Sequence, residues 1–492
     1  MDYLKATPQG VFAGDKKIIL RGMGLGNWLL PEGYMWKFYT KCDRPRRIEA
    51  LIETLCGQEY ALNFWDEFYS KYITKDDITW IRKQGLNSVR LPLNARHLFY
   101  LDTDLHLHFN EKTLNYIDQC LLWCKENEIY LILDMHAAPG GQTGTNIDDS
   151  QHDMPELFAN PIYQDILEEA WCLLAQRYAS EPTIGGYDLI NEPLPNTQKQ
   201  YNAQVAPLYH RLINAIRKID SNHMIILEGV HWASDFSIFE EFTKEELKDN
   251  VLLQFHKYWN NPDEESLVVF LESASRLEVP LWMGEGGENN LYWYTTAFPM
   301  YERAGIGWCF WSYKKMDTKN SPVNVDIPKN WDKLLSYLEG NALLTKEEAR
   351  AIFDDYLDKI SHATYQESVI NALLRKAPVS IPAFAFDKEQ IVSRRNNSVS
   401  FRTTQKAPLL FADGHSGEPN WKRYGGEDQP ESEHLIISMQ QGDMLGYHVT
   451  NFDSITPIYK GDGEILVTQD SDSFIWIQCT KGTVQLQGIN IE

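Results

Sequence analysis

Residues 187–195 read Tyr-Asp-Leu-Ile-Asn-Glu-Pro-Leu-Pro, a short apolar run that ends abruptly on polar residues. Pro193 stops any strand at this point, because it has no N–H to donate and it restricts the residue before it. Asn191 and Glu192 thus stand where a buried strand stops, and we expect their side chains to face a cavity. Taken alone, the motif is equally consistent with a glutamate that is ion-paired at the rim of a sheet.

Short apolar runs of this kind alternate with helical patterns over the first 313 residues of the chain. We predict eight strands, at residues 17–21, 88–92, 130–135, 184–190, 224–227, 251–255, 281–284 and 307–311. The helical patterns include residues 76–84, which Gly85 closes as a left-handed cap, and residues 111–128 and 202–219. Such alternation predicts an α/β fold, a (β/α)₈ or TIM barrel. The alternative is a doubly wound open sheet, but the Gly-rich residues 22–26 lack the G-x-G-x-x-G spacing expected after its first strand.

The pattern changes in the last quarter of the chain. Residues 341–374 are predicted to be helical, and we assign residues 1–375 to the barrel with its helical insertions. After Pro378, short alternating runs at residues 398–401, 435–439, 464–468, 474–478 and 483–487 are separated by Gly, Asp and Asn turns. Residues 376–492 are therefore predicted to form an all-β, sandwich-like domain.

Composition limits the partners and the compartment of this protein. The 46 Lys and Arg against 69 Asp and Glu give a net charge of −23, which argues against nucleic acid as a partner. No run of 18 apolar residues predicts a membrane span. The start of the chain lacks a signal-peptide pattern, and the seven scattered cysteines fit a reducing compartment, so we expect a cytoplasmic protein, or a secreted one if its N-terminus was trimmed. The triplet Asn396-Asn397-Ser398 fits a glycosylation acceptor, but nothing else indicates secretion.

Polar and aromatic side chains stand at the C-terminal ends of all eight predicted strands, where a (β/α)₈ barrel places its active site. In chain order they are Asn27, Trp28 and Glu32, then Arg90, Asp134 and His136, Asn191 and Glu192, Glu228 and His231, His256 and Tyr258, Glu285, and Trp311. Any one of them could be a hydrogen-bonded structural residue. Eight consecutive strand ends of this kind are hard to explain by core packing alone.

Two of these residues are glutamates on strands that face each other across a barrel mouth. Glycosidic bond cleavage needs two such carboxyl groups, about 5 Å apart for retention of configuration and roughly 6.5–9.5 Å apart for inversion. Glu192 and Glu285 fit this requirement, with one carboxyl kept protonated and the other ionised. Arg90 would stabilise the ionised carboxylate, and Tyr258 could donate a hydrogen bond to the same group.

Two further residues suit a sugar, and one alternative involves a metal. Asn191 is placed to bind the 2-hydroxyl of the sugar, and Trp311 offers a flat floor for a pyranose ring. A hydrolase metal site would instead use His136, His231 and His256 with Asp134. No His-x-His or H-E-x-x-H pairing occurs in the chain, and we expect neither a metal nor a cofactor.

Over residues 15–315 the chain resembles glycoside hydrolase family 5, retaining β-glycosidases built on a (β/α)₈ barrel. The matching residues are Arg90, His136, Asn191, Glu192, His256, Tyr258, Glu285 and Trp311. The resemblance implies that Glu192 is the general acid/base and Glu285 the nucleophile, with the other six in supporting roles. Residues 21–29 and 136–144 are similar to the exo-β-1,3-glucanase branch, which implies that Glu32 and a residue near Asp148 contact the terminal glucose.

Three features depart from that branch, namely the aromatic insertion at residues 33–75, Gly286 after the second glutamate, and the appended β domain. They leave β-glucosides, short β-glucans and glycolipids open as substrates. The leading hypothesis is a retaining exo-β-glucanase or β-glucosidase acting on a carbohydrate, with long loops near residues 35–38 and 148–158 closing one end of the cleft. The alternatives are an endo-acting β-glucanase, a glycolipid-directed β-glycosidase of the same family, and a non-catalytic carbohydrate-binding protein.

The predicted β domain has two possible roles. It could be a carbohydrate-binding module, and its candidate stacking residues are Trp421, Tyr424, Tyr459 and Trp476. It could instead pack on the barrel, where it would stabilise the barrel or wall its cleft, and we favour this second role.

Overall fold

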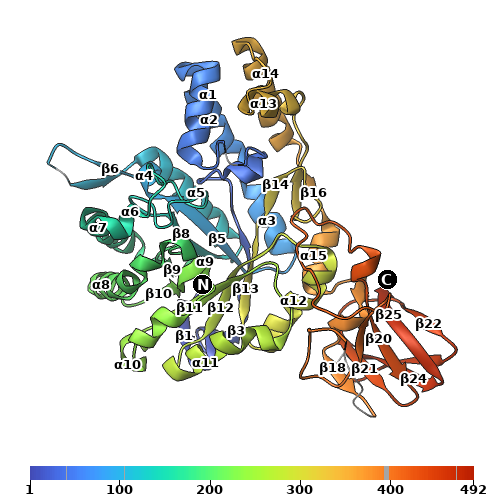
Figure 1. Ribbon diagram of the computed structural model, residues 1–492. Coiled ribbons are helices and arrows are strands. Elements are labelled where there is room, and N and C mark those ends of the chain that lie inside the picture. Colours follow the sequence, from blue (N-terminus) through green and yellow to red (C-terminus); the bar gives the residue numbers. More distant parts are fainter. Residues whose placement is uncertain (40, 105, 393–397, 472–473) are drawn as a thin grey trace.

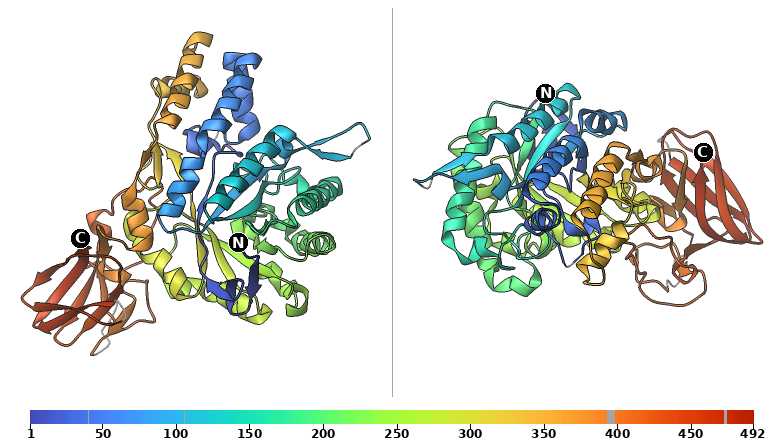
Figure 2. Two further views of the ribbon diagram at one scale, coloured as in Figure 1. Left: turned by 180° about the vertical axis from the view of Figure 1, so that it is seen from behind. Right: turned by 90° about the horizontal axis from the view of Figure 1, so that it is seen from above.

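A computed structural model of the 492-residue chain describes residues 1–39, 41–104, 106–392, 398–471 and 474–492. A barrel surrounded by helices carries a group of antiparallel sheets at one side (Figures 1 and 2). The possible glycosylation acceptor Asn396 lies outside the described residues. Among the described helices, none has the length and apolar character needed to cross a membrane.

Parallel strands form a closed barrel in the centre of the molecule (Figure 1). They are β4 (Arg21–Gly24), β5 (Ser88–Asn94), β8 (Tyr130–Ala137), β9 (Ile184–Asp188), β10 (Met224–Glu228), β11 (Val251–Lys257), β12 (Leu281–Gly287) and β13 (Gly307–Trp311). The barrel closes where β13 pairs with β4. The strands are almost entirely buried, because helices cover their outer face and side chains fill the interior. The predicted (β/α)₈ barrel is confirmed.

The main helices that follow these strands cover the barrel. They are α3 (Lys75–Lys83), α5 (Glu111–Glu126), α7 (Pro161–Tyr178), α8 (Val205–Arg217), α10 (Lys244–Leu247), α11 (Val268–Leu277) and α12 (Leu291–Arg303), and α15 (Glu367–Leu374) packs against α12. Helix α3 begins with a capping box in which Thr74 and Asp77 exchange hydrogen bonds. It is followed by Gly85 in the left-handed conformation (φ 90°), as the sequence predicts.

The first barrel strand differs from the prediction. Residues 17–21 overlap β3 (Lys16–Ile18), which forms a small antiparallel sheet with β1 (Leu4–Thr7) and β2 (Gly10–Ala13). The barrel strand β4 is instead the Gly-rich stretch that follows. A Cβ atom on Gly24 would lie 2.5 Å from Cε3 of Trp311, so that only glycine lets the strand pass this ring. The demand for close packing thus overrides the low strand propensity of glycine.

Two helical segments project together from the same end of the barrel (Figure 1, top). The loop after β4 contributes η1 (Gly33–Trp36), α1 (Pro45–Cys56) and α2 (Gln58–Tyr72), and the chain after β13 contributes α13 (Trp331–Leu338) and α14 (Lys346–Ser361). Their shared core is aromatic, with Trp36 packed against Phe68, Trp331 and Tyr356 at ring-centroid distances of 4.8–6.3 Å. The aromatic insertion noted in the sequence therefore builds a bundle with the segment after the barrel.

Several short elements connect these parts. They are α4 (Ala95–Leu98), β6 (Phe99–Leu101), β7 (Leu107–Phe109), α6 (Glu156–Ala159), η2 (Asn196–Gln204), α9 (Val230–Ala233), η3 (Ser237–Glu241) and η4 (Glu264–Leu267). The sheet β14 (Lys314–Met316), β15 (Val323–Val325) and β16 (Thr364–Tyr365) follows the barrel. Because β16 lies between α14 and α15, the predicted helix at residues 341–374 is in fact two helices.

The described residues of the C-terminal part form two antiparallel sheets. One contains β17 (Val379–Pro382), β25 (Thr483–Ile491), β20 (Leu435–Gln440), β19 (Leu409–Phe411) and β22 (Ile455–Gly461), and the other β18 (Lys388–Gln390), β21 (Met444–His448), β24 (Phe474–Lys481) and β23 (Glu464–Gln469). Two 3₁₀ turns, η5 (Ala383–Ala385) and η6 (Glu431–Glu433), accompany them. The predicted strand at residues 398–401 is wrong, because these residues belong to a long connection in which Val399 forms an isolated bridge to Gly417.

A buried arginine joins the C-terminal sheets to the barrel. Arg375 Nε donates to the carbonyl of Thr295 in α12 at 2.7 Å, and its Nη1 lies 2.5 Å from the carboxylate of Asp387. Strand β17, the first strand of the C-terminal sheets, begins at Val379. The domain boundary between residues 375 and 376 stays a prediction.

Candidate active site

Two glutamates meet at the C-terminal mouth of the barrel. Glu192 follows β9 and adopts a left-handed conformation (φ 43°), whereas Glu285 lies within β12. Both side chains are largely buried, and they approach each other so closely that carboxylate oxygens of the two residues lie within 4.8 Å. So close an approach fits the spacing of about 5 Å at which one carboxylate attacks the anomeric carbon directly, better than the spacing of roughly 6.5–9.5 Å that accommodates an attacking water.

The surroundings of Glu285 favour its ionised form. Tyr258 donates its hydroxyl hydrogen to Glu285 Oε2 at 2.7 Å, and Arg90 pairs with Oε1 through Nη1. Burial by itself would raise the pKa of Glu285, but the charges of His256 and Arg90 and the Tyr258 hydrogen bond outweigh it. The pKa of Glu285 therefore lies below its ordinary value of 4.5, as a nucleophile requires.

The surroundings of Glu192 act in the opposite direction. Burial raises its pKa, and the hydrogen bond from His256 Nδ1 to Glu192 Oε1, at 2.7 Å, offsets this only in part. The two carboxyl groups therefore have pKa values displaced to opposite sides of 4.5. Such a pair can hold one proton donor beside one anion at the same pH.

Arg90 is the hub of the charged network beneath the two glutamates. Its fully buried guanidinium lies 2.8 Å from Asp188, 3.0 Å from Glu228 and 3.1 Å from Asp134, in addition to its contact with Glu285. Burial and the charge of Glu228 raise the pKa of Asp188 well above its usual range, since one guanidinium must serve several carboxylates. The site thus retains protons near Arg90.

Glu228 connects the network to the proposed acid. One carboxylate oxygen, Oε2, accepts a hydrogen bond from the backbone N–H of Glu192 at 2.7 Å. The other, Oε1, accepts from Arg90 Nη2 at 3.0 Å and from Gln254 Nε2 at 2.6 Å. Every one of these partners is a donor, and Glu228 therefore fixes the backbone of Glu192 relative to Arg90.

Asn191 and His136 complete the floor of the site. Asn191 Oδ1 accepts from Arg90 Nη2 at 2.9 Å, and its Nδ2 lies 3.3 Å from His136 Nε2. The ring of Trp311 stacks on His136, with centroids 5.2 Å apart and planes inclined by 6°. Trp311 Nε1 donates to the hydroxyl of Tyr34 at 2.9 Å, and both rings line the cavity described below.

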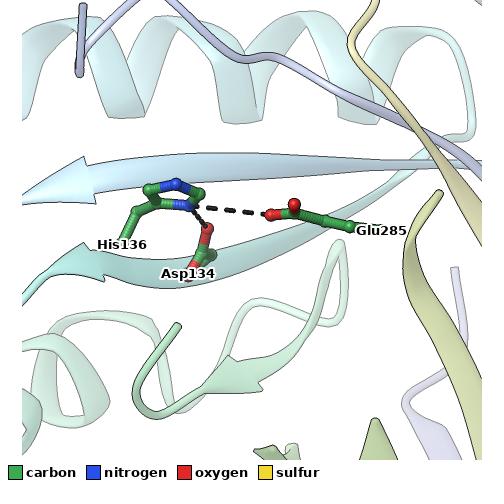
Figure 3. Close-up of side chains that lie close together, drawn as sticks. All are labelled: Asp134, His136 and Glu285. Carbon is green, nitrogen blue, oxygen red and sulfur yellow. Dashed lines mark hydrogen bonds and ion pairs between the residues drawn. The ribbon is translucent and has the colours of Figure 1, made fainter. Parts of the chain in front are cut away.

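Two side-chain groups resemble metal ligand sets. Asp134, His136 and Glu285 form one (Figure 3), and Glu192, His256 and Glu285 form the other. In Figure 3 His136 Nδ1 points toward both carboxylates, at 2.8 Å from Asp134 and 3.9 Å from Glu285. A cation there would have to displace this ring proton and lie beside the Arg90 guanidinium. These carboxylate and imidazole groups are better suited to share protons with one another than to bind a metal. The absence of a metal stays a prediction.

Glu32 enters the cavity from the loop after β4. It is 2% exposed, and its Oε1 has no hydrogen-bond partner in the parts of the chain that the structure describes. Burial raises its pKa well above the usual range. A buried carboxyl with a free acceptor, at the edge of the site, is suited to bind a sugar hydroxyl.

Asp148, near which a sugar contact is predicted, is itself buried. Its Oδ2 accepts from the backbone N–H and the hydroxyl of Thr143 and from the N–H of Gly144, at 2.7–2.9 Å, and Oδ1 accepts from the N–H of Ser150. These four hydrogen bonds turn the carboxylate into its own loop and away from the cavity. The neighbouring residues Asn146 and Ile147 line the cavity, and a sugar contact from this loop stays a prediction.

A cavity of about 1090 Å³ opens above the two glutamates. Glu32, His136, Trp311 and the η1 residues Tyr34 and Met35 line one side of it. Strand β11 and the segments that follow β10 and β11 contribute the apolar side chains Trp232, Trp259, Val269 and Phe270, together with polar ones such as His231, Lys257 and Asn260. Residues of the C-terminal part, Lys422, Tyr424, Gly425 and Glu427, also line it.

Sequence reasoning identified most of this site but assigned no role to the buried residues Glu228, Asp188 and Gln254. Asp134 and Glu228 were recognised as strand-end residues, and Asp188 and Gln254 were not singled out. The available signal was a polar residue within an otherwise apolar, buried strand. Trp421 is buried against Phe384 and Phe401, and Trp476 donates to Asp470 at 2.8 Å, so among the candidate stacking residues only Tyr424 reaches the catalytic cavity.

Comparison with known proteins places the barrel in a family. The family model Cellulase (glycosyl hydrolase family 5) matches residues 53–317. The chain is 32% identical over 260 residues to the Beta-xylosidase of Phanerodontia chrysosporium, covering 52% of this chain and 52% of that protein. It is 24% identical over 243 residues to the Probable glucan 1,3-beta-glucosidase A of Aspergillus fumigatus, covering 49% of this chain and 56% of that protein.

The match thus spans about half the length of both relatives. Among solved structures, the rutinosidase from Aspergillus niger superposes with a TM-score of 0.51 and 16% identity, covering 69% of this chain and 98% of that chain, which shows a shared fold. Because the family model covers more than half of the chain, and includes both glutamates at the barrel mouth, the chain belongs to glycosyl hydrolase family 5.

Proposed function

We propose that this chain is a retaining β-glycosidase that hydrolyses β-glucosidic bonds from the non-reducing end of its substrate. The observation that carries the proposal is the approach of Glu192 and Glu285 to within 4.8 Å, at the bottom of one cavity. The opposite displacement of their pKa values supports it, because the reaction needs one protonated and one ionised carboxyl group.

The reaction follows from these positions in two steps. A carboxylate oxygen of Glu285 forms a bond to the anomeric carbon, while the bond to the leaving oxygen breaks and that oxygen takes the proton of Glu192. Glu192, now ionised, then removes a proton from water, and the water oxygen displaces Glu285 from the anomeric carbon. Two inversions give net retention, and the second step restores both residues to their starting protonation states.

The remaining residues hold the nucleophile in place or bind the sugar. Arg90 and Tyr258 hold the attacking oxygens of Glu285 in place. Glu32 and Trp311, which line one side of the cavity, are suited to a terminal glucose, since one offers a free acceptor and the other a flat ring. The resemblance to a glucan 1,3-beta-glucosidase supports glucose as the glycone.

Hydrolysis of an aryl β-D-glucoside beside an aryl β-cellobioside tests the proposal, with the released anomer followed by NMR. The expected result is rapid release of β-glucose from the monoglucoside. Glu285→Gln should lose at least about 10³-fold in kcat, whereas the exposed Glu278→Gln serves as a matched control. Release of α-glucose, or full activity in Glu285→Gln, would overturn the mechanism, and activity on the cellobioside alone would favour an endo-acting enzyme.

A glycolipid-directed β-glycosidase is the second candidate. The observation in its favour is a group of apolar side chains in the cavity lining, of which Trp232 and Val269 are 44% and 59% exposed. Exposed apolar side chains at a cavity rim commonly mark the place where an apolar part of a ligand binds. Faster hydrolysis of a long-chain alkyl β-glucoside than of cellobiose, compared as kcat/KM, would favour this candidate.

A further inference from the structure

The C-terminal part of the chain contributes directly to the catalytic cavity. Its segment 421–427, which we call the wall segment, supplies Lys422, Tyr424, Gly425 and Glu427 to the cavity lining. This segment lies in the long connection between β19 and β20, which belong to the C-terminal sheets. Residues that follow the barrel by about 100 positions in the chain thereby line the same cavity as the side chains of the barrel.

Three asparagine side chains of the barrel hold the wall segment by its main chain. Asn289 Nδ2 donates to the carbonyl of residue 421 at 2.8 Å, Asn320 Nδ2 to that of residue 424 at 3.0 Å, and Asn290 Nδ2 to that of residue 427 at 3.4 Å. Because these bonds use only backbone carbonyls, they fix the path of the segment without occupying its side chains. The side chains of Lys422, Tyr424 and Glu427 line the cavity, whereas those of Trp421 and Arg423 are buried.

Two further contacts fix the segment at its ends. Trp421 Nε1 donates to Asn261 Oδ1 at 2.8 Å, while its ring packs against Phe384 and Phe401 of the C-terminal part. At the other end, Gly426 has a φ of 79°, and a Cβ atom there would lie 2.8 Å from Cβ of Asn320. A side chain at residue 426 would push the segment off the barrel, and the close approach therefore depends on glycine.

The order of strands around the barrel divides the cavity into two sides. Glu192 follows β9 and Glu285 lies on β12, so the rim between them consists of β10 and β11 in one direction and of β13, β4, β5 and β8 in the other. Glu32, Trp311 and His136 all belong to the second, larger arc. Glu32 offers a free acceptor and Trp311 a flat ring on that arc, so we assign the sugar that bonds to Glu285 to it and the leaving group to β10 and β11.

The smaller arc is aromatic, and the wall segment faces it. Trp259 follows β11, donates its Nε1 hydrogen to the carbonyl of Glu288 at 3.0 Å, and meets the ring of Tyr424 edge-on with centroids 4.6 Å apart. Trp259 is the neighbour of Tyr258, whose hydroxyl binds the nucleophile. Tyr424 is 52% exposed, which leaves a ring face free to contact a ligand.

We propose that Trp259 and Tyr424 form the aglycone subsite, and that the wall segment makes this enzyme select β-glucosides of alcohols with an extended apolar surface. The proposal deepens the proposed function and rests on it for the division into glycone and aglycone sides. Tyr424 acts as a specificity-determining residue, since it touches the leaving group and not the reacting atoms. Its ring, and not its hydroxyl, provides the contact.

The test compares octyl β-D-glucoside with methyl β-D-glucoside in wild type, Tyr424→Ala, Tyr424→Phe and the control Tyr100→Ala, whose ring is similarly exposed on β6. The ratio of kcat/KM for octyl to methyl glucoside should fall at least about tenfold in Tyr424→Ala, and stay within about twofold of wild type in Tyr424→Phe and Tyr100→Ala. Melting temperatures confirm that each variant is folded. An unchanged ratio in Tyr424→Ala, or an equal fall in Tyr424→Phe, would overturn the proposal.

A binding measurement separates this inference from the proposed function. Calorimetry with octyl 1-thio-β-D-glucoside, which the enzyme would bind without turnover, should show about tenfold weaker binding in Tyr424→Ala than in wild type. Weaker binding in this variant, without glucoside hydrolysis by wild type, would overturn the proposed function and support the apolar subsite. Hydrolysis by wild type with equal binding in the two proteins would overturn the subsite alone.

Discussion

Replacement of Glu228 by glutamine tests whether this residue positions Glu192, the proposed catalytic acid. Its Oε2 accepts the backbone N–H of Glu192, and its Oε1 accepts from Arg90 and Gln254. A glutamine has the same shape but carries an NH₂ group in place of one oxygen. Whichever way the amide is turned, this NH₂ faces a donor, because donors surround both oxygens.

The size of the effect follows from the lost hydrogen bond. A hydrogen bond to a buried charged group contributes roughly 1.5–3 kcal/mol, and a buried donor without a partner is costly. We therefore expect Glu228→Gln to cost about 2–3 kcal/mol of transition-state stabilisation, or ~30- to 160-fold in kcat/KM, on substrates that need the proton of Glu192. Substrates whose leaving group departs without a proton should lose much less.

The assay is a series of aryl β-glucosides whose phenols span a range of leaving-group pKa. In Glu228→Gln the loss in kcat/KM should grow as the phenol becomes less acidic, because proton donation then contributes more to the transition state. Glu302→Gln is the matched control, since it loses an ion pair with Arg21 at the other end of the barrel. An equal loss for every phenol, or a loss of less than about threefold, would refute the positioning role.

Three further predictions follow from buried charges. The pH profile of kcat/KM should be bell-shaped. Activity should fall below pH 4.5 as Glu285 becomes protonated, and it should fall at a pH above 4.5 as Glu192 loses its proton. With an activated aryl glucoside, Glu192→Gln should remove the fall on the alkaline side. Burial lowers the pKa of Lys257 from 10.5 to about 8, so the unfolded chain binds more protons between these values and wild-type stability rises with pH across them. Lys257→Met should therefore raise the free energy of unfolding at pH 7 by about 3 kcal/mol, as measured by urea titration. If this gain persists at pH 10.5, it does not come from the lowered pKa of Lys257. Asp387→Ala leaves the Arg375 guanidinium buried without its carboxylate and should lower the free energy of unfolding by about 3–5 kcal/mol in chemical denaturation, whereas a loss under about 1 kcal/mol would show that the pair does not hold the C-terminal sheets to the barrel.

The barrel could be predicted because its strands are buried on both faces. Such strands appear as continuous apolar runs in the sequence. The polar residues that follow each run are explained if they face a cavity at the C-terminal end of the barrel. The prediction failed at Arg21–Gly24, where glycines replace the apolar run. Local propensity could not identify this strand, because the need for glycine comes from Trp311, which lies nearly 300 residues away in the chain.

The residues of the site that stand at strand ends could be predicted in the same way. Glu192, Glu285, Arg90 and Tyr258 could be placed at strand ends by counting, and the structure brings all four together. Asp148 shows the limit of the approach. Its position in a loop near the cavity follows from the sequence, but the direction of its carboxylate depends on the backbone N–H groups of that loop, which only the folded loop presents together.

The barrel and the family likeness could be predicted from the sequence, because these depend on residue types at regular spacing along the chain. The tertiary structure alone decided the distance between the two carboxylates, the network around Arg90 and the place of Tyr424 in the cavity. Those features depend on contacts between residues far apart in the chain. The reason is physical: a hydrogen bond or a pKa shift depends on separations of a few ångströms, and sequence spacing does not specify them across different elements.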